Sequence, residues 1–101
     1  MHLYSLRLVR IVAEKALTEQ ITAFLGSLGV RGYTHFEVAG FGQHGARPGT
    51  SPETANVLIE ALTTEHDAER IMQRVQAQFL PQHALIVYAL DARSLQREKF
   101  L

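Results

Sequence analysis

Regularly spaced glycines mark the segment with the clearest potential for ligand chemistry. Gly40, Gly42 and Gly45 follow an extended segment, residues 33–39, in the pattern G-x-G-x-x-G. In the dinucleotide-binding fingerprint such glycines open a helix, whose free N–H groups receive a pyrophosphate. Two prolines and further glycines follow at once, which rules out a helix and predicts a mobile loop. Because successive N–H groups in a tight glycine turn can form a concave nest, we expect a phosphate-sized anion there.

The length of this loop also favours a function. Residues 39–54 join two predicted strands that a two-residue turn could have joined, and loops longer than about 12 residues without structure of their own are uncommon and often functional. An ordinary long hairpin connection remains the alternative. Within the loop, Gly45 and the side chains of His44 and Arg47 are candidates for anion binding.

Composition excludes several classes of function. The 101 residues suffice for one domain, residues 1–101, and ten basic residues balance ten acidic ones, so we expect no nucleic-acid partner. The absence of cysteine removes disulfides, thiolate nucleophiles and cysteine-ligated zinc. No apolar segment approaches the length that spans a bilayer, and the first residues lack the pattern of a secretion signal, so we expect a cytoplasmic protein without direct membrane insertion.

Metal and catalytic sites are not indicated. The five histidines show no close-spaced pair of the kind that begins a tetrahedral metal site, so we expect no metal. Of these, only His44 lies in the loop, where one imidazole could join ligand oxygens around a cation. No sequence pattern places a base and an acid around a nucleophile, and we therefore expect no catalytic residues and no enzyme activity.

Charged residues occur at two informative places. Arg10 and Glu60 fall inside apolar segments, where an unpaired charge is costly. Either they pair with each other or with a neighbouring subunit, or Glu60 accepts a hydrogen bond from a ribose or a base edge. A basic cluster, Arg93, Arg97 and Lys99, follows the last predicted strand. It is either a solvated tail or a source of phosphate-pairing cations, if it folds back to the glycine loop of the same or an adjacent chain.

Hydrophobic spacing predicts six regular elements in the order β-α-β-β-α-β. The expected strands cover residues 6–12, 33–38, 55–63 and 84–90. The first helix runs from Leu17 to Leu28, with Gly29 at the left-handed cap position. The second begins after Thr64, which has an acid three residues later, and ends before Pro81.

This order predicts an α+β, ferredoxin-like fold, with a four-stranded antiparallel sheet and both helices on one face. Two helices cover one side of such a sheet, yet the first and last strands are apolar on both sides. The uncovered face should be buried by other copies of the chain, so we predict a closed homo-oligomer.

The loop and its preceding strand resemble a known family. Gly32-Tyr33-Thr34, followed by residues 37–45 with the sequence EVAGFGQHG, is similar to the run that leads into the T-loop of PII signalling proteins. The lengths of the elements also agree over nearly the whole chain. The resemblance implies a homotrimer of ferredoxin-like protomers that binds adenine nucleotides in clefts between subunits, with a T-loop at about residues 40–54.

Carried over by position, the resemblance assigns roles to individual residues. Thr34 would meet the adenine, Glu60 and Leu62 would border adenine or ribose, and the backbone at positions 40–43 would approach the phosphates. The full set of expected nucleotide-binding residues is Ile11, Thr34, Val38, Gly40, Phe41, Gly42, Gln43, Glu60, Ala61, Leu62, Gln82, His83, Arg93, Arg97 and Lys99.

Several residues of this chain differ from the PII pattern, and these differences indicate which subgroup of the family it resembles. Where PII proteins carry a phosphate-binding lysine before the final strand, this chain has Gln82 and His83, which weakens triphosphate binding. Asn56 replaces the lysine that pairs with 2-oxoglutarate, and the shorter loop lacks the modified tyrosine. These features are more similar to the PII-like proteins of inorganic-carbon metabolism, namely the carboxysome-associated type and the regulator of the bicarbonate transporter.

This subgroup implies ADP or AMP as regulatory ligand, with bicarbonate, and no tightly bound cofactor. We hypothesise that the nucleotide phosphates and a small anion order the T-loop, through the nest and Arg47, and so create a surface for an unidentified partner protein, a transporter or a carboxysome-related protein. The alternative within the family is a nitrogen-type regulator of a transporter.

Two further classes share the predicted fold. A divalent-cation-binding trimer of the CutA type predicts metal affinity independent of adenine, and the absence of cysteine and of paired histidines argues against it. An acylphosphatase-like hydrolase needs a phosphate loop with an arginine after the first strand, where this chain has Ala13-Glu14-Lys15-Ala16.

Overall fold

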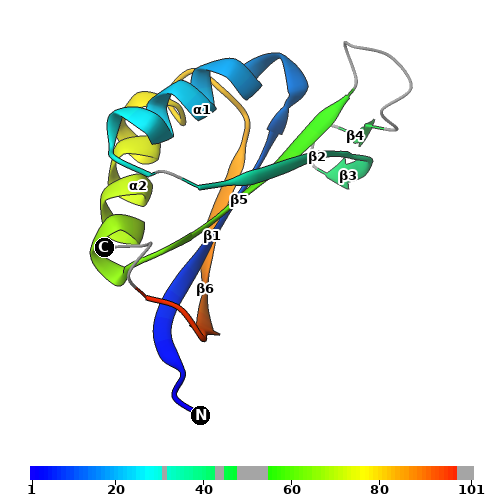
Figure 1. Ribbon diagram of the computed structural model, residues 1–101. Helices are drawn as coiled ribbons and strands as arrows, with labels where there is room; N and C mark the ends of the chain where they lie inside the picture. Colours follow the sequence, from blue (N-terminus) through cyan, green and yellow to red (C-terminus); the bar gives the residue numbers. More distant parts are fainter. Residues whose placement is uncertain (31, 43–44, 48–54, 98–101) are drawn as a thin grey trace.

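The computed structural model describes residues 1–30, 32–42, 45–47 and 55–97. In this part of the chain, one four-stranded antiparallel sheet has the strand order β2-β5-β1-β6. Its strands are β1 (Tyr4–Glu14), β2 (Thr34–Val38), β5 (Asn56–Thr63) and β6 (Ile86–Ser94). The two central strands are β5 and β1, and β2 and β6 form opposite edges, as Figure 1 shows.

Both long helices pack on the same face of the sheet (Figure 1). A short 3-10 helix, η1 (Lys15–Leu17), leads from β1 into α1 (Thr18–Ser27), and α2 (Glu65–Gln78) connects β5 with β6. The predicted ferredoxin-like βαββαβ arrangement is confirmed. The last strand is displaced from the predicted range, because residues 91–94, three of which are polar, extend it by pairing with the start of β1.

Local signals in the sequence set the helix ends. At the end of α1, Gly29 has a φ of 83°, its N–H donates to Gly26 O at 3.0 Å, and the N–H of Val30 donates to Leu25 O at 3.1 Å. These two bonds make a Schellman motif, which requires a left-handed residue. At the start of α2, the Thr64 hydroxyl accepts the N–H of Asp67 at 3.2 Å. Both predicted caps are confirmed.

The core lies between the helices and one face of the sheet. Alternate residues of β1 and β5, among them Val9, Ile11 and Ile59, are almost completely buried there together with Ile21 and Ile71 of the helices. Phe24 of α1 meets Phe79, at the end of α2, edge to face with 5.3 Å between ring centroids. Because side chains alternate along a strand, the even-numbered residues of β1 and β5 lie on the other face, which neither helix covers.

The glycine loop has regular structure where it leaves β2, contrary to the prediction. Two short strands, β3 (Gly40–Gly42) and β4 (Gly45–Arg47), pair antiparallel, with Gly42 opposite Gly45. Ladder pairing holds these glycines in extended backbone, in which successive N–H groups point to opposite sides. The predicted nest therefore does not extend over residues 40–42.

Candidate functional site

A polar row crosses all four strands on the uncovered face of the sheet. Glu60 of β5 lies opposite Thr34 of β2 and opposite Arg10 of β1, and Arg10 lies opposite Tyr88 of β6. We call these four residues the polar rung. The strand register brings together Arg10 and Glu60, fifty positions apart in sequence, places Thr34 beside Glu60, and adds Tyr88, which the sequence analysis did not connect with them.

Contacts within the polar rung are ionic and aromatic. Arg10 Nε lies 3.1 Å from Glu60 Oε2, and the side chains are 30% and 26% exposed. The guanidinium carbon of Arg10 lies 5.6 Å from the centre of the Tyr88 ring, within the range of a cation–π interaction. Arg10 and Glu60 therefore pair with each other within one chain, and the hydrogen bond from a ribose or a base edge to Glu60 stays a prediction.

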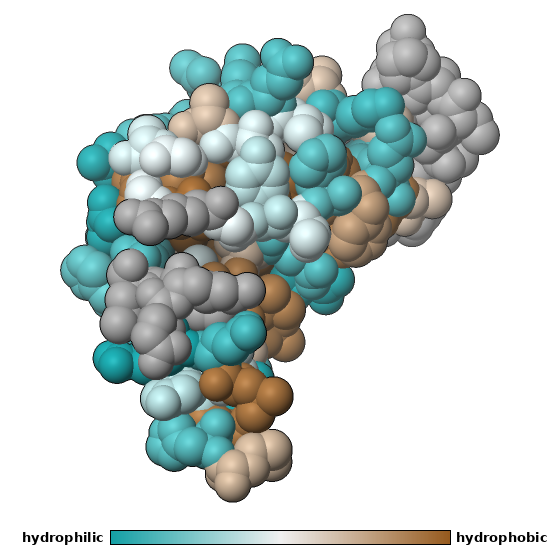
Figure 2. Space-filling model, viewed as in Figure 1, coloured by the Kyte–Doolittle hydropathy of each residue, from teal (hydrophilic) through white to brown (hydrophobic). Residues whose placement is uncertain are grey.

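Apolar rows flank the polar rung on both sides. The row nearer the glycine loop contains Phe36, Leu58, Val12 and Ile86, one from each strand, and the row on the other side contains Leu62, Leu8 and Leu90. Ile86, Phe36 and Leu90 are 61%, 46% and 44% exposed. Hydrophobic residues accordingly reach the surface beside the long strands in Figure 2, whereas the outer surface of the helices is mainly hydrophilic.

One group of the expected nucleotide-binding residues lies together at the β2 edge. Thr34 and Glu60 are cross-strand neighbours, Leu62 is two residues from Glu60 on the same face, and Val38 ends β2 where the chain continues into β3. The expected adenine-binding and ribose-binding positions therefore lie on the same edge of the sheet as the base of the glycine loop, about 13 Å along β2 from Val38.

A second group lies at the opposite edge. Gln82 and His83 belong to the connection between α2 and β6, and the His83 ring contacts Phe79 with 6.3 Å between ring centroids. The strand that follows them begins with Ile86, opposite Val12, at the same end of the sheet as the base of the glycine loop. Three strand spacings separate the edges, about 14 Å in total, so Gln82 and His83 do not meet Thr34 within one chain.

The basic cluster is also distant from the glycine loop of the same chain. Arg93 lies opposite Ser5, at the far end of β6, and Arg97 follows that strand. The intervening length of strand, from Ser5 to Val12, corresponds to roughly 23 Å. This separation argues against contact of Arg93 with the glycine loop of the same chain.

Two of the expected binding residues are core residues. Ile11 and Ala61 are 1% and 3% exposed and belong to the cluster beneath the helices. Their odd positions in β1 and β5 place them on the face opposite Glu60, so their side chains cannot line a crevice on the uncovered face. Gln43, His44 and Lys99 lie outside the described residues, and for Gly40, Phe41, Gly42, Gly45 and Arg47 the described feature is the backbone pairing of β3 with β4.

Lys15 joins the two ends of the glycine loop, a role that sequence reasoning missed. Its backbone N–H donates to Ala55 O at 3.0 Å, directly before β5, and its ammonium group pairs with the Glu37 carboxylate in β2. The charges of Lys15 and Glu37 were visible in the sequence, but their proximity depends on how η1 leaves β1.

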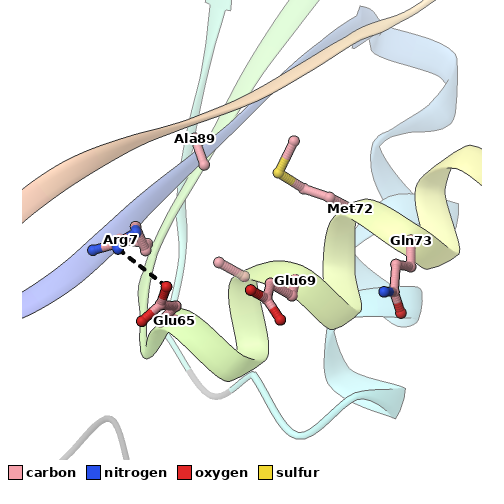
Figure 3. A pocket seen from close by; sticks show the side chains of 7 residues that line it. Arg7, Glu65, Glu69, Met72, Gln73 and Ala89 are labelled. Atoms are coloured by element: carbon pink, nitrogen blue, oxygen red, sulfur yellow. Dashed lines mark ion pairs between the residues drawn. The ribbon is translucent and has the colours of Figure 1, made fainter.

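Among the residues that the structure describes, two hollows lie on the helix side of the sheet, away from the polar rung. One of about 800 Å³ lies between α1 and β2 and includes Lys15, Glu37, Tyr33 and His35. The other, of about 260 Å³, lies between α2 and the strands, where Arg7 pairs with Glu65 at 3.3 Å and Met72 faces Ala89 (Figure 3). Neither hollow contains Thr34, Glu60 or Leu62, so we do not assign the nucleotide to them.

The described part of the chain offers neither a cluster of metal-ligating side chains nor a membrane-spanning helix. Among those residues, no three His, Cys, Asp or Glu side chains lie close enough together to hold a metal ion. No helix there combines the length and the apolar character needed to cross a bilayer.

Comparison with known structures gives matches over the whole chain. A protein from Thermus thermophilus, described provisionally as a PII-like signalling protein, is 35% identical over 100% of both chains with a TM-score of 0.87. CPII from Thiomonas intermedia, solved with ADP and bicarbonate, is 30% identical over 92% of this chain and 91% of its own, with a TM-score of 0.83. Another CPII structure, with ADP, AMP and bicarbonate, is 27% identical over 93% of this chain and 99% of its own, with a TM-score of 0.79.

Family and structure agree on the relationship that the loop motif predicted. A search of curated proteins gave no match. The model of the family described as nitrogen regulatory protein P-II matches residues 6–99, nearly the whole chain. Together with the similarity in fold to PII-like proteins, this match shows that the chain belongs to the P-II family and is a PII-like regulatory protein.

Proposed function

We propose that this protein is a sensor that binds ADP or AMP in crevices between the copies of a homotrimer. The observation that carries the proposal is the division of the expected binding residues between two sheet edges. Thr34, Glu60 and the base of the glycine loop lie at the β2 edge, whereas Gln82 and His83 precede β6, the other edge strand, and about 14 Å separate these two strands. A site that uses both groups has to be completed by a second copy of the chain.

The uncovered sheet face supports the oligomer. It exposes Ile86, Leu90 and Phe36 in two apolar rows, and a monomer would leave these side chains in water. Packing three such faces together would bury the rows and bring the β2 edge of one copy toward the β6 edge of the next. Interfaces in which two different edges meet are heterologous, and they form a closed ring when the rotation between copies allows it.

The ligand classes follow from the relatives. CPII was solved with ADP, AMP and bicarbonate, and the similarity to this chain covers more than nine tenths of both proteins. In the proposed arrangement, Thr34 and Glu60 contact the adenosine, and the backbone of β3, up to Gly42, approaches the phosphates. Bicarbonate is the second ligand of the same crevice.

The proposed output is a change in the T-loop. Lys15, at the end of β1, contacts both ends of this loop, through a hydrogen bond to Ala55 O and an ion pair with Glu37. A ligand at the loop base therefore acts on a segment whose ends are held, and its binding energy is available to select one loop conformation. The ordered loop would then control a partner protein in inorganic-carbon metabolism, in the cytoplasm, without catalysing a reaction.

Calorimetry on the purified protein tests the proposal. AMP, ADP, ATP, cyclic AMP and bicarbonate are titrated separately, and bicarbonate is titrated again after saturation with ADP. We expect heat from ADP and AMP and a bicarbonate signal that grows when the nucleotide is present. Absence of heat from every nucleotide, confirmed by an unchanged melting temperature, would refute the sensor function.

A matched pair of glycine variants locates the ligand. Gly42→Asp places a carboxylate at the loop base and should abolish the ADP signal, because a negative charge there repels phosphate. Gly26→Asp adds the same charge in α1, where an added Cβ meets open space, and should leave ADP binding intact. Equal losses in the two variants would contradict the assignment of the phosphates to this end of β3.

A further inference from the structure

We propose that Arg10 is a positioning residue for the nucleotide crevice, which fixes the Glu60 carboxylate from the neighbouring strand. This inference rests on the proposed function and adds to it a residue that does not contact the nucleotide. The one-chain geometry of the polar rung carries it: Tyr88 supports Arg10, Arg10 pairs with Glu60, and Glu60 lies beside Thr34.

The surroundings of Glu60 explain why it needs such support. Its neighbours on the same face of β5 are Leu58 and Leu62, and the adjacent positions on β1 are Val12 and Leu8. A half-buried carboxylate in this apolar setting is costly unless it is paired. Without a fixed cation beside it, the Glu60 carboxylate would lower its free energy by rotating toward water. That rotation would turn it away from the direction that a ribose or adenine donor requires.

Arginine is suited to this task because its guanidinium group is planar and carries five N–H donors. The Tyr88 ring, 5.6 Å from the guanidinium carbon, restricts the plane of the group, and Glu60 lies 3.1 Å from Nε. Lysine at this position would keep the charge but would lose both the stacking surface and the fixed direction of the donors.

The Nε atom of Arg10 has no hydrogen-bond partner in the described part of the single chain. It is buried, and despite the short distance to Glu60 Oε2 it makes no hydrogen bond of acceptable geometry within the described residues. Buried donors without a partner are rare in folded proteins. A small rotation of the Glu60 carboxylate would complete this bond, and we infer that this rotation accompanies nucleotide binding, when Glu60 accepts a donor from the ligand.

The test is a double-mutant cycle in ADP affinity. Arg10→Met removes the charge and keeps an unbranched apolar side chain, Arg10→Lys keeps the charge, and Glu60→Gln removes the charge of the partner. We expect Arg10→Met to weaken ADP binding by about three- to tenfold, the factor associated with immobilising one flexible side chain. Arg10→Lys should be intermediate, and Arg10→Met should have no further effect in the Glu60→Gln background.

Arg7→Met is the matched control. Arg7 lies three residues away on the same strand, is similarly exposed at 28%, and pairs with Glu65 and Asp91 at 3.3 Å each, on the helix side of the sheet. The Arg7→Met variant should bind ADP with the affinity of the wild type. Sedimentation of every variant checks that all of them form assemblies of the same mass as the wild type. If the Arg10→Met assembly dissociates into single chains, Arg10→Lys takes its place in the cycle.

The outcomes separate this inference from the proposed function. Additive effects of the Arg10 and Glu60 substitutions, or equal losses in the Arg10→Met and Arg7→Met variants, overturn the positioning role. If the wild type binds no adenine nucleotide, the proposed function fails, and a crystal structure of the unliganded Arg10→Met variant decides the positioning role by itself. A Glu60 carboxylate turned toward solvent would support it, and an unmoved carboxylate would overturn it.

Discussion

Replacement of Leu90 by aspartate should dissociate the proposed trimer without unfolding the chain. Leu90 lies on β6, opposite Leu8, in an apolar row of the uncovered face, and is 44% exposed in the single chain. Aspartate at this site is tolerated in a solvated strand but would be trapped between apolar side chains in an oligomer. The variant therefore distinguishes a buried sheet face from one that remains in water.

The size of the effect follows from the exposed fraction. Complete burial of a leucine side chain stabilises by about 1.5–3 kcal/mol, so burial of the remaining 44% contributes about 0.7–1.3 kcal/mol per copy. Over three copies this is about 2–4 kcal/mol, and each 1.4 kcal/mol corresponds to about tenfold in the association constant. The desolvation of three carboxylates adds a further penalty that no partner charge in the row offsets.

Leu80→Asp is the matched control. Leu80 is the same residue type, is 41% exposed, and follows α2, outside the sheet. Sedimentation velocity at micromolar concentration should find the wild type and Leu80→Asp at three chain masses and Leu90→Asp at one, all with the same far-ultraviolet circular dichroism. A Leu90→Asp protein that keeps the wild-type mass, or a Leu80→Asp protein that also dissociates, would refute burial of this sheet face.

Two further predictions concern the helix ends and are read from denaturant unfolding. Gly29→Ala should lower the free energy of unfolding by about 1–2 kcal/mol, because a residue with a Cβ is strained at a φ of 83°. Gly26→Ala should raise the free energy of unfolding by about 0.5–1 kcal/mol, because Gly26 lies inside α1 and a Cβ added there meets open space. Changes of the same sign in the two variants would contradict the Schellman motif. Thr64→Ala should lower the free energy of unfolding by about 1 kcal/mol, because the hydroxyl that accepts the Asp67 N–H is lost. Thr22→Ala, which removes only an exposed hydrogen bond to Glu19 O within α1, should change it little, and an equal loss in both variants would argue against the cap.

Local patterns in the sequence determined the succession of elements and the ends of the helices. The period of the apolar residues separated strands from helices, Gly29 and Thr64 set the caps, and strands that are apolar on both sides indicated an uncovered face. These features are predictable because each depends on residues a few positions apart. The loop motif likewise indicates the P-II family without reference to the fold.

Tertiary structure alone decided which of the expected binding residues lie on the same surface. The register of β1 with β5 and β6 joins Arg10, Glu60 and Tyr88, and the same register places Ile11 and Ala61 in the core. A shift of one residue would have reversed both results, since neighbouring side chains in a strand point to opposite faces. The pairing of β3 with β4, and the distance between the sheet edges that makes a second copy necessary, also depend on contacts between segments that no local pattern specifies.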